Sequence, residues 1–143
     1  MNYISPIRSA ASLGALALAL SVCAVAGPLP TPVTENGITY LSGGFDPEEA
    51  LALQAVVRNY PLSLMFSAGE RKEPLADVKV TIKDAGGKVL LDAFATGPIM
   101  LVELPAGRYT VAALKSTPGA PLQQSVQVTP RGEARLDFHW DQS

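Results

Sequence analysis

Histidine and cysteine, the residues that most often ligate metals or supply catalytic groups, each occur once in this chain of 143 residues, as His139 and Cys23. A histidine can act as the general base of a Ser–His–Asp hydrolase, whereas a zinc site needs three or four histidine, cysteine or carboxylate ligands. One histidine and one cysteine therefore argue against a zinc centre. We predict a protein that is not an enzyme, with no catalytic residues, no metal and no cofactor, and keep a small hydrolase using His139 as an alternative.

The sequence around His139 favours an ordinary strand residue over a catalytic one. Polar and apolar side chains alternate near the C-terminus, in the order Arg135, Leu136, Asp137, Phe138, His139 and Trp140. Because neighbouring residues of a β-strand point to opposite faces of the sheet, His139 should face away from Phe138 and Trp140, toward solvent. The hydrolase alternative requires a pocket that joins His139 to a serine and a carboxylate.

A second candidate, the segment Ser42-Gly43-Gly44, precedes a predicted helix and has the flexibility of a phosphate-binding loop. Three acidic residues follow it, Asp46, Glu48 and Glu49, and they would repel a phosphate. The chain also lacks the Gly-Lys-Ser/Thr and Gly-x-Gly-x-x-Gly patterns of nucleotide-binding loops. We therefore predict that this segment acts as a hinge and a helix cap.

The first 26 residues have the three parts of a secretory signal peptide. Arg8 supplies the positive start, Ala10–Val22 is an apolar run, and Ala24-Val25-Ala26 gives the small residues that signal peptidase requires. The apolar run is shorter than the ~20 residues that span a membrane. We predict cleavage after Ala26, or alternatively after Ala24, and a periplasmic or secreted protein that has left the membrane.

Cys23 gives rise to an alternative, because Leu20-Ser21-Val22-Cys23 is similar to the lipobox at which bacterial lipoproteins are acylated. Val22 departs from that pattern, which usually has Gly, Ala or Ser at this position. The alternative is a lipid-anchored envelope structural protein held through Cys23. Cleavage after Ala26 would instead leave a protein with no cysteine and hence no disulfide.

The charge of the chain argues against nucleic acid as a partner. The chain has 11 basic and 13 acidic side chains and a formal net charge of −2. The predicted leader contains Arg8 and no acidic residue, so its removal leaves 10 basic against 13 acidic groups, a net charge of −3. A mildly acidic protein without a basic stripe does not attract a phosphate backbone.

One helix is strongly indicated over residues 47–60. Asp46 suits its N-cap, Pro47 its first turn, and Glu49 the third position of a capping box. An apolar stripe follows with helical spacing and consists of Leu53, Val56, Val57 and Tyr60. Pro61 ends the helix, because a proline disfavours helical geometry at the residue before it. A helix with one apolar stripe usually packs on a sheet.

After Pro61 the hydrophobic period changes from 3.6 to 2, which indicates β-strands. The clearest strand alternates Val78, Val80 and Ile82 with polar residues. The predicted strands, separated by turns rich in glycine and proline, are 62–67, 77–83, 88–95, 98–104, 108–114, 125–129 and 135–140. We predict a mainly β protein, an antiparallel seven-strand β-sandwich preceded by one amphipathic α-helix.

These elements divide the chain into a signal peptide (1–26), a Pro-rich spacer (27–35) and a single β-sandwich domain (36–143) that includes the helix. Asn36-Gly37 is a turn signal at the start of the domain, and Ile38–Leu41 after it is a candidate for a further short strand.

The segment 104–111, Leu-Pro-Ala-Gly-Arg-Tyr-Thr-Val, resembles a signature of carboxypeptidase regulatory-like domains and of the related transthyretin-like (prealbumin-like) and collagen-adhesin B-type sandwiches. The segment 78–90, with Val-Lys-Val-Thr-Ile and Gly-Gly-Lys-Val-Leu, fits the early hairpin of the same family. Gly107 permits a turn that other residues disfavour, and Tyr109 would place a large side chain in the sandwich. The resemblance covers residues 62–140 and implies the fold rather than a function. The arrangement is also similar to small exported bacterial proteins that have this domain and no assigned activity.

The catalytic chemistry of these relatives is not matched in the chain. Zinc carboxypeptidases need a cluster of His and Glu, and transthyretin-like hydrolases need several histidines, whereas this chain has only His139. Collagen-adhesin domains can form a Lys–Asn isopeptide bond, for which Lys79 or Lys83 is available. The two asparagines after the leader, Asn36 and Asn59, do not lie on a late strand. The resemblance is therefore to the non-catalytic module.

We expect a non-enzymatic exported binding or interaction module of the cell envelope. Its partner would be another envelope protein or a second copy of the chain. Either would bind through a sheet edge, because edge strands present unpaired backbone groups to which another strand can add.

Overall fold

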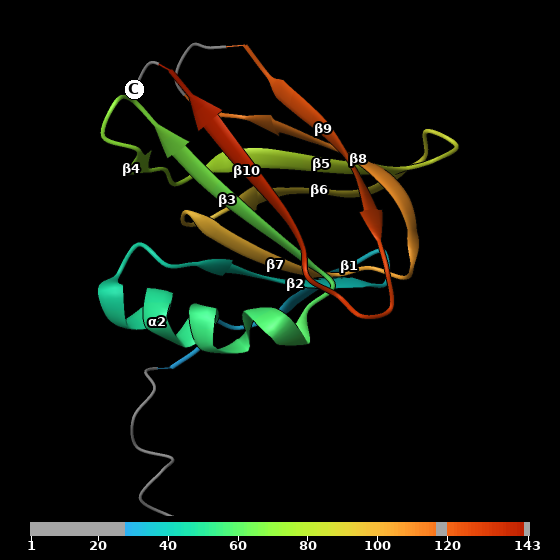
Figure 1. The fold of residues 1–143 in the computed structure, drawn as a ribbon, viewed down its shortest axis with the longest axis horizontal. Helices are drawn as coiled ribbons and strands as arrows, with labels where there is room; N and C mark the ends of the chain where they lie inside the picture. Colours follow the sequence, from blue (N-terminus) through green and yellow to red (C-terminus); the bar gives the residue numbers. More distant parts are fainter. Residues whose placement is uncertain (1–27, 117–119, 142–143) are drawn as a thin grey trace, which may run out of the picture.

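The computed structural model describes residues 28–116 and 120–141 (Figure 1). The predicted signal peptide 1–26, with Cys23 and both predicted cleavage sites, lies outside the described residues. Within the described residues, no helix is long and apolar enough to cross a membrane.

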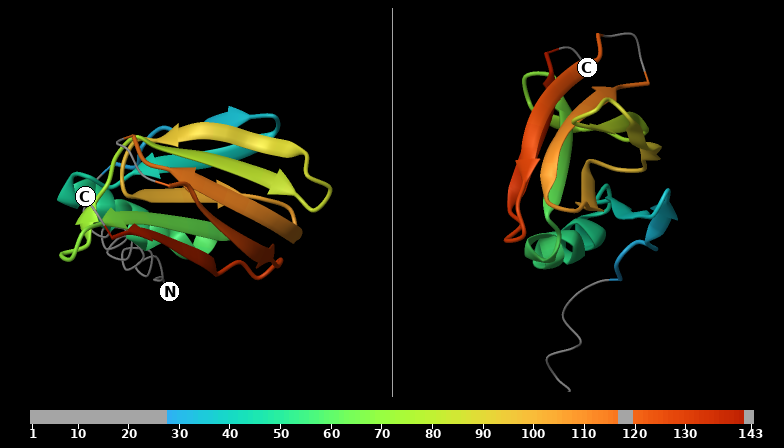
Figure 2. Two further views of the ribbon diagram at one scale, coloured as in Figure 1. Left: turned by 90° about the horizontal axis from the view of Figure 1, so that it is seen from above. Right: turned by 90° about the vertical axis from the view of Figure 1, so that its right-hand side faces the viewer.

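Two β-sheets pack face to face and form a sandwich (Figures 1 and 2). The strand order of sheet A is β1-β2-β7-β3-β10, and β4 also pairs with β3. The strand order of sheet B is β6-β5-β8-β9. The strands of sheet A are β1 (Val33–Glu35), β2 (Ile38–Gly43), β3 (Leu62–Ala68), β4 (Glu73–Pro74), β7 (Ile99–Glu103) and β10 (Ala134–Trp140). The strands of sheet B are β5 (Val78–Asp84), β6 (Val89–Ala95), β8 (Gly107–Leu114) and β9 (Leu122–Val128).

The predicted mainly β sandwich is confirmed, and each of the seven predicted strands is present, as β3 and β5 to β10. The described residues form ten strands, however, and not seven. β1 and β2 form a hairpin that extends sheet A beyond β7, and β4 adds a pairing of two residues to the end of β3.

One pair of strands departs from the predicted antiparallel arrangement. β3 and β10 run parallel, in a register that joins Leu62 to Ala134 and Ala68 to Trp140. Every other strand pair in the described part of the chain is antiparallel. The alternation of side chains along a strand indicates which face is buried, but it carries no information on the direction of the neighbouring strand.

The predicted spacer 27–35 ends in a strand, which is a correction to the predicted domain boundary. Glu35 pairs with Ile38, so only Asn36 and Gly37 form the turn between β1 and β2. Their φ angles of 52° and 80° are the left-handed values that a two-residue hairpin turn needs, and Asn-Gly adopts them readily. The prolines that precede β1 masked the strand in the sequence, because proline is rare inside sheets.

The main core lies between the two sheets. Alternate residues of the central strands point into it and are fully buried, among them Leu64 and Phe66 in β3 and Val80 in β5. The rings of Phe66 and Phe138 stack with their centroids 5.9 Å apart. Burial of such apolar surface, at about 25 cal/mol per Å², is the main source of stability for a sandwich of this kind.

A second, smaller core lies on the outer face of sheet A, under helix α2 (Pro47–Val56) and the short 3₁₀ helix η2 (Val57–Asn59). The buried residues of this core are Leu41, Leu53, Ile99 and Leu101. β7 is apolar on both faces, so its outer face also needs cover, which the helix provides. Figure 2 shows the helix on the side of sheet A that faces away from sheet B. The helix predicted over 47–60 is thus present, with its last residues wound as a 3₁₀ turn.

The N-terminus of α2 differs from the predicted capping box. Asp46 occupies the N-cap position, but its side chain makes no capping hydrogen bond. Glu49 Oε1 instead accepts a hydrogen bond of 2.7 Å from the backbone N–H of Gly44. The glutamate therefore reaches past the N-cap and fastens the preceding loop to the first turn of the helix.

Candidate functional site

Two adjoining cavities form a groove between the helix and the outer face of sheet A. One cavity, of about 380 Å³, is lined by Leu53, Met65 and Ile99, with Gln54 at its rim. The other, of about 280 Å³, is lined by a different set, Arg58, Tyr60 and Glu133. Both cavities are also lined by Val57, Ser63 and Arg135. We call the combined space the α2 groove, the first cavity its apolar end and the second its arginine end.

The groove exists because the helix covers only part of the outer face of sheet A. Helix α2 lies over β2 and β7, whereas β3 and β10 continue the sheet beyond it. Ser63 and Arg135 are register partners on these two strands. Their size difference leaves a depression, because Ser63 is small and 6% exposed while Arg135 is long and exposed. The Ser63 hydroxyl donates a hydrogen bond of 3.4 Å to the carbonyl of Ala134.

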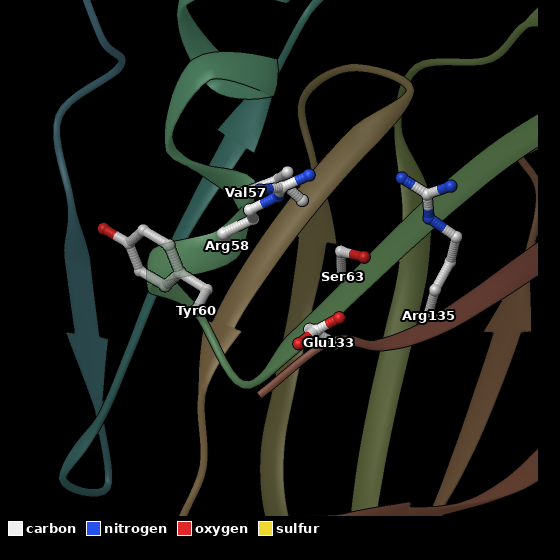
Figure 3. Close-up of a pocket in the computed structure, with 6 residues that line it drawn as sticks. All are labelled: Val57, Arg58, Tyr60, Ser63, Glu133 and Arg135. Atoms are coloured by element: carbon white, nitrogen blue, oxygen red, sulfur yellow. The ribbon is translucent and has the colours of Figure 1, made fainter. Parts of the chain in front are cut away.

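Two arginines from different elements define the arginine end. Arg58 comes from η2 and Arg135 from β10. Figure 3 shows the ends of the two side chains turned toward each other, with the Ser63 hydroxyl between them in this view. No ion pair or side-chain hydrogen bond joins either guanidinium to another residue of the described chain. Glu133 lines the same cavity, yet it makes no ion pair within 4.0 Å with either arginine.

Tyr60 gives the arginine end an aromatic wall. Its ring is half-buried and packs against the second core. Burial raises the pKa of its hydroxyl, and the nearby negative charge of Glu103 raises that pKa further. The phenol therefore stays neutral at physiological pH. In Figure 3 its hydroxyl points away from the other labelled side chains, so the ring rather than the oxygen faces the groove.

His139 lies on the outer face of sheet A, opposite Phe138 and Trp140, as the alternation indicated. It is half-buried rather than exposed, and its Nδ1 is 3.0 Å from the hydroxyl oxygen of Ser67, its register partner on β3. In a Ser–His–Asp triad the serine contacts Nε2 and the carboxylate holds Nδ1, so this pair uses the other nitrogen. No carboxylate is hydrogen-bonded to His139 within residues 28–116 and 120–141. Neither Ser67 nor His139 lines the α2 groove.

The structure also places the remaining candidates from the sequence. The predicted hinge Ser42-Gly43-Gly44 is wrong for its first two residues, because Ser42 and Gly43 end strand β2 and pair with β7. The N–H of Gly44 donates to the Glu49 carboxylate. Lys79 lies 3.8 Å from Asp92 in an ion pair. The Asn36 side chain donates to the carbonyl of Leu90 and not to a lysine, so neither Lys79 nor Asn36 contacts a partner for a Lys–Asn isopeptide bond among the described residues. The described residues contain no group of three or more histidine, cysteine or carboxylate side chains placed to hold a metal.

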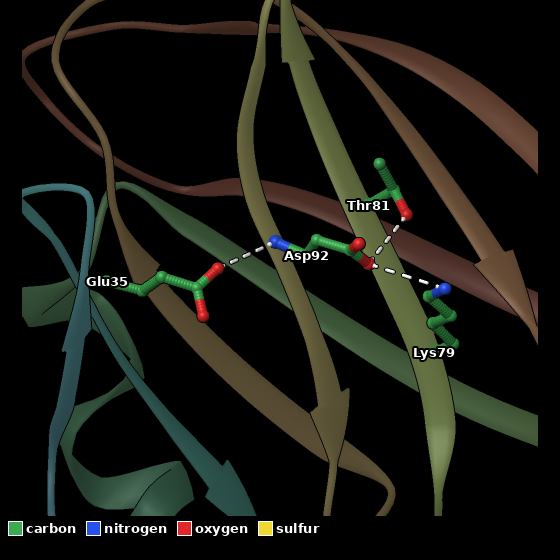
Figure 4. Close-up of polar contacts among 4 residues, drawn as sticks. All are labelled: Glu35, Lys79, Thr81 and Asp92. Atoms are coloured by element: carbon green, nitrogen blue, oxygen red, sulfur yellow. Dashed lines mark hydrogen bonds and ion pairs between the residues drawn. The ribbon is translucent and has the colours of Figure 1, made fainter.

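Side chains from the β1–β2 hairpin occupy the edge of sheet B at β6. Glu35 Oε2 accepts a hydrogen bond of 3.0 Å from the backbone N–H of Asp92 (Figure 4). Asn36 donates to the carbonyl of Leu90 at 3.2 Å, and Ser42 accepts from the N–H of Thr96 at 3.1 Å. A strand added at this edge would have to displace the hairpin.

The Asp92 side chain continues the contact onto the outer face of sheet B. Its Oδ1 accepts from Thr81 at 3.3 Å and lies 3.8 Å from the Lys79 ammonium (Figure 4). At the edge of sheet A, the Gln124 side chain donates a hydrogen bond of 2.7 Å to the carbonyl of Asp137 in β10. Backbone groups on two of the four sheet edges are thus already paired with side chains of the protein itself.

No protein-family model matches this chain, and no curated protein sequence matches it. The sequence did not single out Arg58, Ser63 or Arg135. Each is ordinary in its own segment, and the three meet only because β3 and β10 pair in parallel beside η2.

Proposed function

We propose that the protein is a non-enzymatic binding module of the cell envelope that holds a segment of a partner protein in the α2 groove. The observation that carries this proposal is the groove itself, an open channel with an apolar floor at one end and, at the other, two arginines that make no ion pair with the described part of the chain. Ligand sites are concave, mostly apolar and supplied with a few polar groups that orient the ligand.

The groove is a better docking place than two of the four sheet edges. The backbone of β6 is bonded to Glu35 and Asn36, that of Thr96 directly after β6 to Ser42, and the Asp137 carbonyl of β10 to Gln124. Proteins protect edge strands in this way against unwanted pairing. Two edges remain for the predicted homodimer or envelope partner, β1 with three residues and β9 with seven.

The export part of the proposal rests on the predicted signal peptide 1–26, and the family part on the resemblance of residues 62–140 to carboxypeptidase regulatory-like, transthyretin-like domains. Under this proposal β3 and β5 to β10 are the module, and β1, β2 and α2 are additions to it, of which α2 forms one wall of the groove. The intact mass of the protein isolated from its native cell tests whether the signal peptide is cleaved as predicted. Cleavage after Ala26 is expected, whereas a diacylglycerol adduct on Cys23 would favour the lipid-anchored alternative.

Site-specific photocrosslinking tests the binding module directly. Gln54 at the rim of the groove and Gln127 on the outer face of sheet B are both exposed, so they form a matched pair. Each is replaced in turn by p-benzoylphenylalanine in the native cell. We expect a discrete adduct from position 54 that is absent from position 127. Equal labelling at both positions, or no adduct at position 54, would overturn the proposal.

A small hydrolase using His139 is the second candidate, and the hydrogen bond between Ser67 and His139 is the observation that favours it. It predicts hydrolysis of p-nitrophenyl acetate that is lost in Ser67→Ala and in His139→Ala and retained in Gln127→Ala. The binding module predicts instead that the natural protein and the three variants all hydrolyse this ester at the same rate.

A further inference from the structure

We propose that the arginine end of the α2 groove binds the C-terminal carboxylate of a partner peptide, and that the apolar end receives the side chain of its last residue. This inference rests on the proposed function, because it names the ligand of the same groove. Its structural basis is the contact between a cationic cavity and an apolar cavity that share Val57, Ser63 and Arg135.

The charges at the arginine end fit an anion. Arg58 and Arg135 bring two positive charges to the cavity, and Glu133 brings one negative charge. Neither guanidinium is paired with a carboxylate of the described chain. A guanidinium binds a carboxylate through two parallel N–H···O bonds, and these charge-assisted bonds are stronger than those between neutral groups.

The same charges favour a carboxylate over a phosphate. The cavity carries one net positive charge, which one carboxylate neutralises. A phosphate group with nearly two negative charges would exceed that balance, and Glu133, which lines the same cavity, would repel it more strongly than it repels a carboxylate.

The polar groups of the groove match the last peptide unit of such a ligand. The Ser63 hydroxyl uses its proton on the Ala134 carbonyl, so its oxygen lone pairs are available to accept a peptide N–H. Gln54 at the rim offers an amide that can both donate and accept.

The apolar end explains why the carboxylate should belong to an apolar terminal residue. Leu53, Met65 and Ile99 form the floor of a cavity of about 380 Å³ that joins the arginine end directly. In a C-terminal residue the carboxylate and the side chain are attached to the same carbon atom. One residue can therefore place its anion between the arginines and its side chain on this floor.

Nuclear magnetic resonance titrations with defined peptides test the inference. The probe is acetyl-Gly-Ser-Gly-Ser-Leu with a free carboxylate, compared with the same peptide as a C-terminal amide, with acetyl-Gly-Ser-Gly-Ser-Gly as the free acid, and with inorganic phosphate. We expect the leucine acid to shift the amide signals of Val57, Arg58, Ser63 and Arg135, and the other three probes to bind at least tenfold more weakly.

Two double variants separate the groove from general surface charge. Arg58→Gln with Arg135→Gln should weaken binding of the leucine acid at least tenfold. Arg71→Gln with Arg108→Gln removes the same charge from two other exposed arginines and should leave the binding unchanged.

The inference is overturned if the leucine acid and its amide bind equally, if the acid does not bind, or if phosphate binds as tightly as the acid. A crosslink from position 54 that persists alongside such a result would leave the binding module standing and only its ligand chemistry wrong. If neither the crosslink from position 54 nor selective binding of the leucine acid is observed, the proposed function is wrong as well.

Discussion

Tyr109 donates a hydrogen bond of 2.7 Å from its phenolic hydroxyl to the backbone carbonyl of Pro105, four residues earlier in the chain. The contact closes the turn before β8, while the Tyr109 ring is buried in the main core. One side chain therefore fixes both the turn and the strand of the segment 104–111, whose sequence resembles a family signature.

Replacement of Tyr109 by phenylalanine should remove this hydrogen bond and keep the ring. We expect the free energy of unfolding to fall by about 1 kcal/mol, the usual net contribution of such a bond. Urea unfolding of the purified protein measures the loss. Tyr60→Phe is the control, because no hydrogen bond of its hydroxyl is present in the described structure, and it should change the stability by less than about 0.5 kcal/mol. Equal losses in both variants would contradict the role given to Tyr109.

High pH should destabilise the protein. The pKa values of Tyr40, Tyr60 and Tyr109 are raised, first by burial and then by the charges of nearby carboxylates. These tyrosines therefore lose their protons less readily in the folded than in the unfolded protein. Their contribution to stability is complete below the ordinary tyrosine pKa of 10.0 and is lost as the pH rises above it.

Urea unfolding at a series of pH values between about 8 and 11 measures this effect. Tyr109→Phe removes one of the three groups and should show a smaller decrease between these limits than the natural protein. An identical decrease in both proteins would show that other groups, such as the lysines, cause the alkaline destabilisation.

The sequence predicted the elements whose signals are local. The alternation in residues 135–140 correctly placed His139 on the face opposite Phe138. The stripe that includes Leu53 and Tyr60 correctly predicted a helix with one face on apolar partners. Each of these patterns depends only on the geometry of a single helix or strand.

The rest depended on contacts between distant segments. The parallel pairing of β3 and β10 brings Ser63 beside Arg135, and the fold brings Arg58 to the same cavity. In the sequence, an arginine on the polar face of an element looks like any solvent-exposed charge. No local pattern therefore predicted the groove. The hydrogen bond between Ser67 and His139 was hidden in the same way, since it also spans β3 and β10.

Helix α2 offers a matched pair of leucines for testing the second core. Leu53 is fully buried, whereas Leu51, two residues away, is 66% exposed. Leu53→Ala should lower the free energy of unfolding by about 2–5 kcal/mol, because it leaves a cavity among Leu41, Ile99 and Leu101. Leu51→Ala should change it by less than about 0.5 kcal/mol. If chemical unfolding shows similar effects for the two variants, the helix does not pack on sheet A as described.

Gly97 lies against the backbone of β2. A Cβ atom at this position would lie 2.5 Å from the carbonyl carbon and oxygen of Gly43, which are backbone atoms that cannot rotate away. Gly97→Ala should therefore destabilise the protein by about 1–3 kcal/mol, the usual cost of forcing an extra methyl group into a packed site. Gly86→Ala is the control, because its added Cβ would meet only the Asp84 side chain at 3.5 Å. Thermal unfolding should show a lower midpoint for the first variant only, and an unchanged midpoint for Gly97→Ala would rule out the close approach.

Glu35 should protect the edge of sheet B. Its carboxylate accepts the N–H of Asp92, so Glu35→Ala frees a backbone donor on β6. Hydrogen exchange at the Asp92 amide should become at least several-fold faster, because a side chain no longer shields it. The free edge should also increase self-association, since unpaired edge strands add to one another. Exchange mass spectrometry and sedimentation velocity measure the two effects.

Glu70→Ala is the control, because it removes another exposed glutamate that has no hydrogen bond or ion pair in the described structure. It should change neither the exchange rate nor the self-association. If exchange at Asp92 stays as slow in Glu35→Ala as in the natural protein, the β1–β2 hairpin does not guard this edge through Glu35, and strand addition at β6 would again be open to a partner.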